Sequence, residues 1–376
     1  MASTLKVDTI TTPDGTGDIT FSRPIVGNLT AQKNIIINGD FDIWQRGTSF
    51  AAAAHRDYIA DRWSYSKVGA MVHTISRDTD VPTVAESGHL SSYSMKIDCT
   101  TVDSSMATGD ICALQYRMEG YDWKYIAQQA ITLSFWHKHT KTGTYCIAIK
   151  NSGADKSWVQ EYTQTTTNTW EKATLTIDAS PSAGTWNYTN GVGVFLCFTL
   201  AAGATYQGTT DTWNSANNDA TSSQVNACDN TANNFMLSQV QLEAGSVATD
   251  FEVKNHADEL ARCQRYFEIL NGDPILAANV YGTGQCISTS EARCPIMYKV
   301  KKRSAPTITD SGDANFRITN AAYSAVEVTS LSWLTLSRTS VLAVITGTAT
   351  PLIAGNATVF KDDGESQSTI SISAEL

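Results

Sequence analysis

The sequence has no closely spaced pair of cysteines. Its eight cysteines stand at positions 99, 112, 146, 197, 228, 263, 286 and 294, and none belongs to a CxxC pair. Close pairs are the usual sign of a disulfide scaffold or a zinc motif. Cys146 and Cys197 instead lie inside apolar runs, as small hydrophobic residues do. We therefore expect all eight cysteines to be reduced thiols.

Long apolar runs and basic clusters are also scarce. No stretch approaches the roughly 20 apolar residues that cross a membrane, and no basic segment followed by an apolar one opens the chain. The formal charge is −10, from 27 basic and 37 acidic residues, and basic residues gather only at 299–303. These features predict a soluble protein made in a cytosol, with no membrane insertion and no nucleic-acid partner.

Catalytic motifs are absent as well. The chain contains no GxSxG, HExxH or P-loop signature, and no repeat of the kind that builds a right-handed β-helix. Asp57 with Asp61, and Asp362 with Asp363, come nearest to a pair of glycosidase carboxylates. We expect these four to be solvated loop charges. The sequence therefore predicts a protein that is not an enzyme.

What the chain does contain is the pattern of β-strands. Charged residues make up only 17% of it, and apolar and polar residues alternate at 131–135 and 236–242. Residues 192–200 are apolar on both parities, as in a central strand covered on both faces. We predict an all-β protein with two antiparallel β-sandwich or jelly-roll domains, a body domain over 31–252 and a C-terminal head domain over 273–376.

A linker and a short α-helix are predicted between these domains, over 253–272. Apolar residues there have spacings of three, four and three, which places them on one helical stripe, and an Asn-Gly pair at 271–272 is a typical helix stop. The stripe would pack either on its own sandwich or, in three copies, around a threefold axis. Its members are Leu260, Cys263, Phe267 and Leu270.

Residues 1–30 form an extended segment that is too short for a core of its own. Two short alternating pieces flank a turn at 13–17. Such a segment is either a disordered tail or an arm that becomes ordered when it docks on a larger body.

A series of phrases, which we call the signature phrases, runs through residues 34–270: NGDFDIWQRG, DRW, ITLSFWHK, VQLEAGSVATDFE and ELARCQRYFE. The series resembles that of bacteriophage tail-fibre and tailspike-like virion structural proteins, which carry a carbohydrate-binding-module-like jelly roll. The first 30 residues resemble their virion-attachment segments, and the closing SAEL resembles their terminal β domain.

This resemblance implies a non-enzymatic virion protein that is synthesised in the bacterial host cytoplasm and is usually a homotrimer. Residues 1–30 would bind other virion proteins, and the distal domains would face a host cell-surface glycan. The resemblance also favours the threefold arrangement for the helical stripe at 260–270, which makes it a trimerisation helix. It leaves open whether such a fibre sits on the tail or on the head of the particle.

Five aromatic residues are candidates for saccharide binding, because sugar rings stack on exposed aromatic faces. Trp136 lies on the polar face of its predicted strand, where it is either a stacking platform or covered by a loop or a neighbouring subunit. The others fall in or near predicted polar loops, where a ring is either exposed or pins its own loop. They are Trp158, Tyr162, Tyr206 and Trp213.

Two groups of residues have the donor atoms for a metal ion. His137 and His139 point to one face of a strand, but nothing nearby completes a ligand set, so we expect solvated strand-end histidines. Asn38, Asp40 and Glu243 would approach one another if the first and last strands of the sandwich pair, as in calcium-bearing carbohydrate modules. Turn capping by the first two is the simpler interpretation. We expect no cofactor, with structural calcium as the option left open.

The leading functional prediction is a phage fibre or spike that adheres weakly and multivalently to host-surface saccharide. A head or neck decoration protein that stabilises the virion without binding a receptor is the alternative. A polysaccharide depolymerase is the third.

Overall fold

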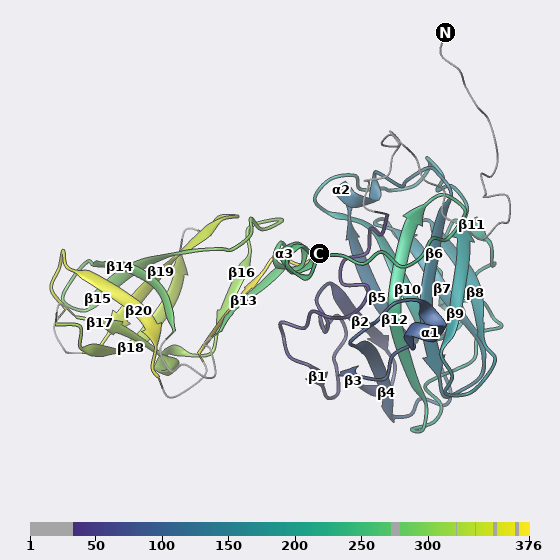
Figure 1. Cartoon of the computed structure of the whole chain (residues 1–376), viewed down its shortest axis with the longest axis horizontal. Coiled ribbons are helices and arrows are strands. Elements are labelled where there is room, and N and C mark those ends of the chain that lie inside the picture. The colour runs from purple at the N-terminus through teal and green to yellow at the C-terminus, as the bar shows by residue number, and fades with distance from the viewer. Residues whose placement is uncertain (1–32, 272–278, 321, 335, 349–351, 365–367) are drawn as a thin grey trace, which may run out of the picture. The chain divides into compact units, whose positions relative to one another are not determined.

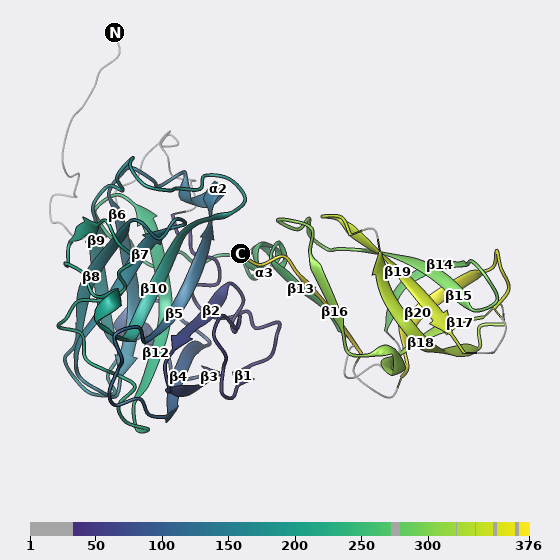
Figure 2. The same cartoon turned by 180° about the vertical axis from the view of Figure 1, so that it is seen from behind.

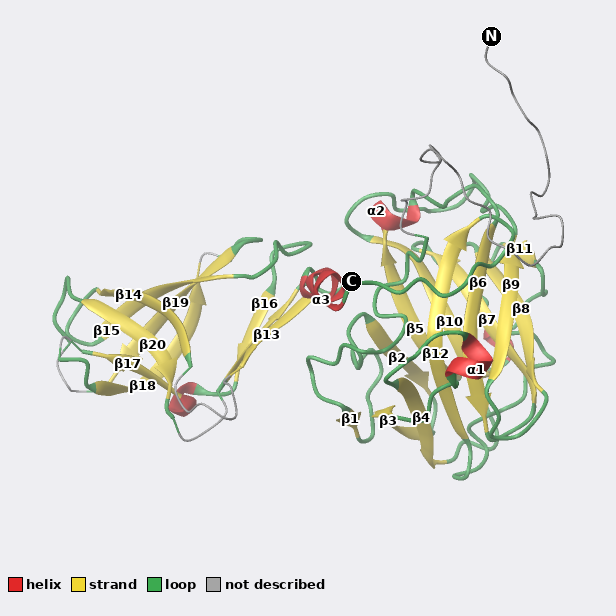
Figure 3. Ribbon diagram, viewed as in Figure 1, coloured by secondary structure: helices red, strands yellow, loops and turns green. Residues whose placement is uncertain are grey.

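A computed structural model describes residues 33–376, apart from 272–278, 321, 335, 349–351 and 365–367 (Figure 1). The predicted attachment segment, 1–30, lies outside the described residues. The all-β class is confirmed, with short helices among many strands (Figure 3). No helix in the described ranges combines the length and the apolar character needed to cross a membrane.

The body domain is a sandwich of two antiparallel sheets, seen from opposite sides in Figure 1 and Figure 2. The first sheet has the order β1 (Ser49–Phe50), β3 (Val72–Asp78), β4 (Ser94–Thr101), β12 (Asn234–Ala244), β6 (Ile131–His139) and β9 (Glu171–Ile177). The second sheet has the order β11 (Thr212–Asn214), β8 (Ser157–Gln164), β7 (Gly143–Asn151), β10 (Val192–Ala202), β5 (Ile111–Glu119) and β2 (Trp63–Val68). Short helical turns are α1 (Val84–Ser87), α2 (Gly120–Trp123) and η1 (Ala204–Tyr206).

The core lies between the two sheets, on the parity that the sequence predicts. Leu133 and Phe135 of β6 are fully buried there, and Leu196 and Phe198 of β10 face them from the second sheet. The predicted closing strand is β12, which pairs with both β4 and β6 inside the first sheet. The alternation therefore identified the faces of β6 correctly. On β12 it failed for Met236, which lies on the outer face because the register shifts between Ser238 and Gln241.

The long loop between η1 and β12 covers the outer face of the second sheet. Asp219 of this loop forms a buried ion pair with Lys150 of β7, 2.7 Å long, and its carbonyl oxygen accepts a hydrogen bond from Thr199 of β10. Ala220 packs there against the buried thiol of Cys146 and its neighbours. The segment is thus a packed cover of the sheet rather than a solvated connector.

The predicted helix of 253–272 is only half a helix. Asn255 caps the start of α3 (His256–Gln264) by accepting a hydrogen bond from the backbone N–H of Ala257. The chain then enters strand β13 (Phe267–Asn271), which pairs with β21 (Thr369–Ser373). The helix prediction beyond residue 264 was wrong, because pairing with a strand some hundred residues away outweighs the local helical pattern.

The predicted trimerisation stripe is consequently not a helical stripe. Leu260 and Cys263 lie on α3, whereas Phe267 and Leu270 lie on β13. Cys263 is fully buried in the core of its own sandwich, and Leu260 packs against that core. These residues are used within the chain, so they do not form an open helical seam for two further copies.

The C-terminal part corrects the prediction of a second sandwich. It consists of a three-stranded sheet and a closed six-stranded barrel. The sheet has the order β13, β21 and β16 (Thr307–Asp310). The barrel has the order β14 (Val280–Cys286), β15 (Glu291–Met297), β19 (Ser340–Gly347), β18 (Ala325–Leu334), β17 (Phe316–Thr319) and β20 (Ala357–Asp362), with η2 (Asp313–Asn315) before β17. Pairing of β14 with β20 closes the barrel. One-sided alternation suits a sandwich and a barrel equally, so the pattern does not show this closure.

All eight cysteines are free thiols, as predicted, and all eight are buried.

Candidate functional site

A buried arginine connects signature phrases that are far apart in the sequence. Arg62 of DRW is 1% exposed. Its guanidinium donates to the carboxylate of Glu375 and lies 3.5 Å from the centre of the Tyr266 ring. Arg46 of the first phrase also pairs with Glu375, at 2.9 Å, and lies 3.5 Å from the centre of the Phe267 ring. We call this group the arginine joint; it fastens β13 and the residues after β21 to the sandwich.

Asp61, the residue before Arg62, is a buried carboxylate next to the arginine joint. Its carboxylate accepts hydrogen bonds from the backbone and the side-chain amide of Gln45, both 2.7 Å long. Burial raises the pKa of Asp61 to about 6, although the charge of Arg46 and the bonds from Gln45 act in the opposite direction. The expectation that Asp61 is a solvated loop charge was therefore wrong, and so was that for Asp362, which is 3% exposed. Asp57 is exposed and caps its own turn.

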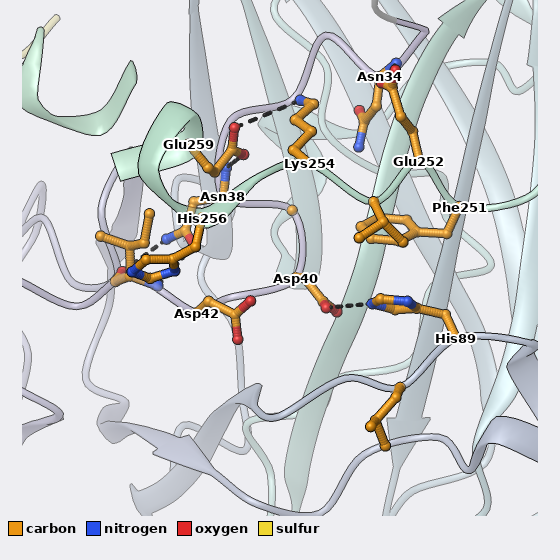
Figure 4. Close-up of a pocket in the computed structure, with 14 residues that line it drawn as sticks. Asn34, Asn38, Asp40, Asp42, His89, Phe251, Glu252, Lys254, His256 and Glu259 are labelled. Carbon is orange, nitrogen blue, oxygen red and sulfur yellow. Dashed lines mark hydrogen bonds and ion pairs between the residues drawn. The ribbon is translucent and has the colours of Figure 1, made fainter. Parts of the chain in front are cut away.

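A pocket of about 190 Å³ lies next to the first signature phrase (Figure 4). Three segments form it: residues 34–43, His89 with Leu90, and the stretch from Phe251 to Glu259. The rings of His89 and Phe251 are 5.1 Å apart and make its apolar wall. The pocket thus brings together three signature phrases and a loop, at His89 and Leu90, that no phrase includes.

Asp40 and His89 form an ion pair on one side of this pocket. The Nε2 atom of His89 lies 2.7 Å from a carboxylate oxygen of Asp40 (Figure 4). The other carboxylate oxygen accepts a hydrogen bond from Ser91. This hydrogen bond to Asp40 raises the pKa of His89. The pair is an internal contact that leaves little of either polar group for a ligand.

Asp42 and His256 are the polar side chains of the pocket that remain unpaired. Both residues are exposed, and within the part of the chain that the structure describes neither side chain has a hydrogen-bond partner. Burial and the nearby charge of Asp40 raise the pKa of Asp42. A carboxylate and an imidazole thus offer an acceptor and a donor to a small polar ligand.

Glu259 and Lys254 form the opposite side. Glu259 accepts a 2.5 Å hydrogen bond from the backbone N–H of Asn38, while its Oε2 atom is buried without a hydrogen-bond partner among the described residues. Lys254 donates to the carbonyl oxygen of Ile36 and lies 3.9 Å from Glu259. Burial lowers the pKa of Lys254 to about 8, although Glu259 acts to raise it. The linker is thereby anchored to the first signature phrase.

The structure brings together only two of the three predicted calcium ligands. Asn38 and Asp40 line the pocket, but the side chain of Asn38 is occupied by backbone groups, including Ile43. Glu243 does not line the pocket and accepts two hydrogen bonds from Thr249 instead. The turn-capping interpretation describes Asn38 better than the metal-ligand one.

Three of the five predicted saccharide-binding aromatics are buried. Trp136 packs with Trp170 and Met236 on the outer face of the first sheet and is 9% exposed. Trp158 and Tyr162 lie on strand β8, not in loops, and belong to the main core. Gln160 and Gln164 share the inner face of β8 with these two aromatic residues, so the sequence lacks the apolar alternation that would have predicted the strand. Tyr206, on η1, is half-buried.

Trp213 is the predicted tryptophan that keeps part of its surface open. It is half-buried on β11, and its indole N–H donates to the carbonyl oxygen of Asp178. Trp186, which the sequence analysis missed, makes an edge contact with Trp213 at 5.7 Å and stacks on the buried Trp123 at 5.7 Å. Trp158 supports Trp213 from the core at 5.9 Å. We call the surface of Trp186 and Trp213 the tryptophan platform.

His137 and His139 are buried rather than solvated, which corrects the expectation for this pair. Both belong to an aromatic group in the core, and His139 stacks on Tyr145 with ring centres 3.7 Å apart. Burial lowers the pKa of His137 to about 4 and, with the charge of His137, lowers the pKa of His139 well below its ordinary value. They are neutral core residues at physiological pH.

No model of a protein family and no curated protein sequence matches this chain. Among solved structures, it is similar to the enzymatically active domain of tailspike protein 4 of bacteriophage CBA120, with 16% identity and a TM-score of 0.31 over 56% of this chain. The match covers 21% of that tailspike chain. It is also similar to TmCBM61 in complex with β-1,4-galactotriose, with 10% identity and a TM-score of 0.30 over 57% of this chain and 99% of that one.

A third similar structure is the family 11 carbohydrate-binding module from Clostridium thermocellum in complex with a mixed-linked tetrasaccharide. It has 10% identity and a TM-score of 0.27, and the match covers 54% of this chain and 98% of that module.

Proposed function

We propose that this chain is a fibre or spike protein of a phage particle, which binds saccharide on the host surface without cleaving it. One observation carries the saccharide part: two unpaired polar side chains, Asp42 and His256, face a pocket of about 190 Å³ beside the ring of Phe251. Saccharide binding needs this combination, because hydroxyl groups require hydrogen-bond partners while the sugar ring packs on an apolar surface. The volume suits one sugar unit rather than a long chain.

A single shallow contact of this size gives weak binding, so adhesion requires several copies. We propose a homotrimer that docks on other virion proteins through residues 1–30 and presents three pockets per fibre. The phage assignment rests on the signature phrases. Because α3 is packed on its own sandwich, the proposed trimer must use surfaces other than the 260–270 residues.

Binding is tested with the full-length chain, fluorescently labelled, on host cells and on polysaccharide extracted from them. We expect Asp42→Ala to weaken binding about tenfold, the effect of losing one good hydrogen bond to a charged group. Glu327→Gln, an exposed barrel residue with the same change of charge, is the matched control. If the fluorescent chain does not stain host cells, and antibodies against the chain do not block adsorption of the phage, a decoration protein would be favoured.

The tryptophan platform is the second candidate location for the same function. Loss of binding in Trp186→Ala or Trp213→Ala, with normal binding in Asp42→Ala, would move the saccharide site there. Release of new reducing ends from the polysaccharide would instead support the depolymerase alternative. Light scattering at micromolar concentration tests the trimer, which a monomeric mass would contradict.

A further inference from the structure

A cluster of soft donor atoms is buried inside the sandwich, away from the pocket. His73 comes from β3 in the first sheet, Cys112 from β5 in the second, and Cys228 from the long loop before β12. One ring nitrogen of His73 and the two sulfur atoms all lie within 4.8 Å of one another. None of the three residues is more than 2% exposed. The cluster therefore joins both sheets and the loop at one point.

The separations are somewhat longer than those of an occupied tetrahedral metal site. Cys228 Sγ is 3.8 Å from His73 Nε2, whereas Cys112 Sγ is 4.0 Å from the other ring nitrogen, Nδ1. Taken with a single ring nitrogen, the three donor atoms lie within 4.8 Å of one another. With zinc–sulfur bonds of about 2.3 Å and zinc–nitrogen bonds of about 2.0 Å, tetrahedral ligand atoms stand roughly 3.5–3.8 Å apart. To hold an ion, the donors would have to move closer together by up to roughly 1 Å.

Two neighbours complete the arrangement. Tyr65 places its hydroxyl oxygen 2.5 Å from His73 Nδ1 and 3.4 Å from Cys112 Sγ. Nδ1 is therefore occupied, and Nε2 is the ring nitrogen left for an ion, with Nδ1 oriented by a partner as in metal-binding histidines. Cys99 is the cross-strand partner of His73, so both side chains leave the sheet on the same face. Its sulfur lies 3.9 Å from the carbonyl oxygen of Cys228. A fourth thiol thus lies beside the cluster, although its sulfur is outside the group of three donors that lie within 4.8 Å of one another.

We propose that His73, Cys112 and Cys228, with Cys99 as the fourth ligand, form a structural site for a thiol-preferring metal ion of the zinc class. The thiols bind as thiolates and release one proton each to the solvent, while the imidazole binds neutral. The bound ion cross-links the two sheets and fixes the start of β12. The donors come from positions 73, 99, 112 and 228, so no short sequence motif marks the site.

The other buried thiols of the sandwich differ in their surroundings. Cys146 and Cys197 lie among alanine and valine side chains on the outer face of the second sheet, with no imidazole in that cluster. Cys146→Ser therefore serves as the matched control, because it removes an equally buried thiol without touching the proposed site.

The test uses the full-length chain, expressed with added zinc and purified in a reductant that is not itself a thiol. Because the site is buried, the ion must be supplied during folding rather than soaked in afterwards. We expect inductively coupled plasma mass spectrometry to find about one zinc ion per chain. The Cys112→Ser/Cys228→Ser variant should lose the ion, and Cys146→Ser should keep it.

A second readout needs no variant and so does not depend on how well a variant folds. Wild-type chain refolded with Co²⁺ should show the charge-transfer absorption of thiolate–cobalt bonds, and removal of the ion should lower its melting temperature. Zinc content no higher than in the double variant would overturn the proposal. A cobalt spectrum without thiolate absorption would overturn it as well.

Discussion

Acidification should destabilise the sandwich through its two buried histidines. His137 and His139 are 1% and 0% exposed, and burial lowers the pKa of His137 to about 4, below its ordinary 6.5. The unfolded chain therefore binds protons at a pH where the folded chain does not. Stability is complete above pH 6.5 and is lost as the pH falls through the range from 6.5 to about 4.

The size of the effect depends on how far the pH lies below the pKa of histidine in the unfolded chain. At pH 5, about 1.5 pH units below the unfolded value, each neutral histidine costs about 2 kcal/mol of unfolding free energy, at about 1.4 kcal/mol per unit. His139→Phe isolates one of these contributions, because a phenyl ring fits between the rings of Tyr145 and Phe235, which stack on His139 at 3.7 and 4.5 Å. The loss of stability between pH 7 and pH 5 should shrink by about 2 kcal/mol in the variant.

Urea unfolding at the two pH values, followed by tryptophan fluorescence, measures this difference. The fluorescence reports the sandwich, since Trp333 is the one tryptophan of the sequence outside it. His256→Gln, at an exposed position on α3, controls for removal of a histidine as such. If His139→Phe and the wild type lost the same stability on acidification, the argument from burial would be refuted.

Three further predictions concern buried charges and a close backbone approach. Asp61 should have the opposite effect on the pH dependence of stability, because its pKa in the folded chain is about 6, above the ordinary 3.8. It therefore adds stability at low pH that is lost as the pH rises from about 4 to 6. Urea titrations across that range should show a smaller loss of stability in Asp61→Asn than in the wild type. Lys302→Met should lower the free energy of unfolding by about 3–5 kcal/mol. The substitution leaves Glu268 without the cation of an ion pair that is 2.6 Å long and 0% exposed. The melting temperature should recover in Lys302→Met/Glu268→Met, and an unrecovered melting temperature would contradict this prediction. Gly39→Ala should cost about 1–3 kcal/mol in urea unfolding, because its Cβ would stand 2.2 Å from the carbonyl oxygen of Val240; an unchanged midpoint would show that the backbone has room to move.

Strand faces were predictable from the sequence because each face of a sheet buries every second residue. The parity of 131–135 matches the buried face of β6. On β12 it holds for Val240 and Leu242 but not for Met236, because the register shift between Ser238 and Gln241 moves the core-facing residues from odd to even positions. The pattern was less informative where polar side chains occupy the inner face, as Gln160 and Gln164 do on β8. The local pattern also does not show which strands pair over long sequence distances, so the residues of β13 were predicted as the second half of a helix.

The candidate site could be predicted only in part. Asn38 and Asp40 were singled out and do line the pocket, but their side chains are occupied by internal partners. The unpaired groups are Asp42, two residues further on, and His256 in the linker. Nothing in the local sequence distinguishes an unpaired carboxylate from a capping one. The His73 cluster was missed for a related reason, since its members come from different sheets.

The arginine joint and α3 hold the two ends of the loop that carries Asp40 and Asp42. Gln45 donates to the carbonyl oxygen of Phe267, and Arg46 pairs with Glu375, so the residues just after the pocket loop are held by β13 and by the residues after β21. Asn38, at the other end of that loop, is held by Glu259 of α3. Both ends of the Asp40–Asp42 turn are therefore fixed by contacts far away in the sequence. Most of these contacts involve residues of the signature phrases. If the pocket binds saccharide as proposed, its specificity would come from the few side chains between them that the fold leaves unpaired.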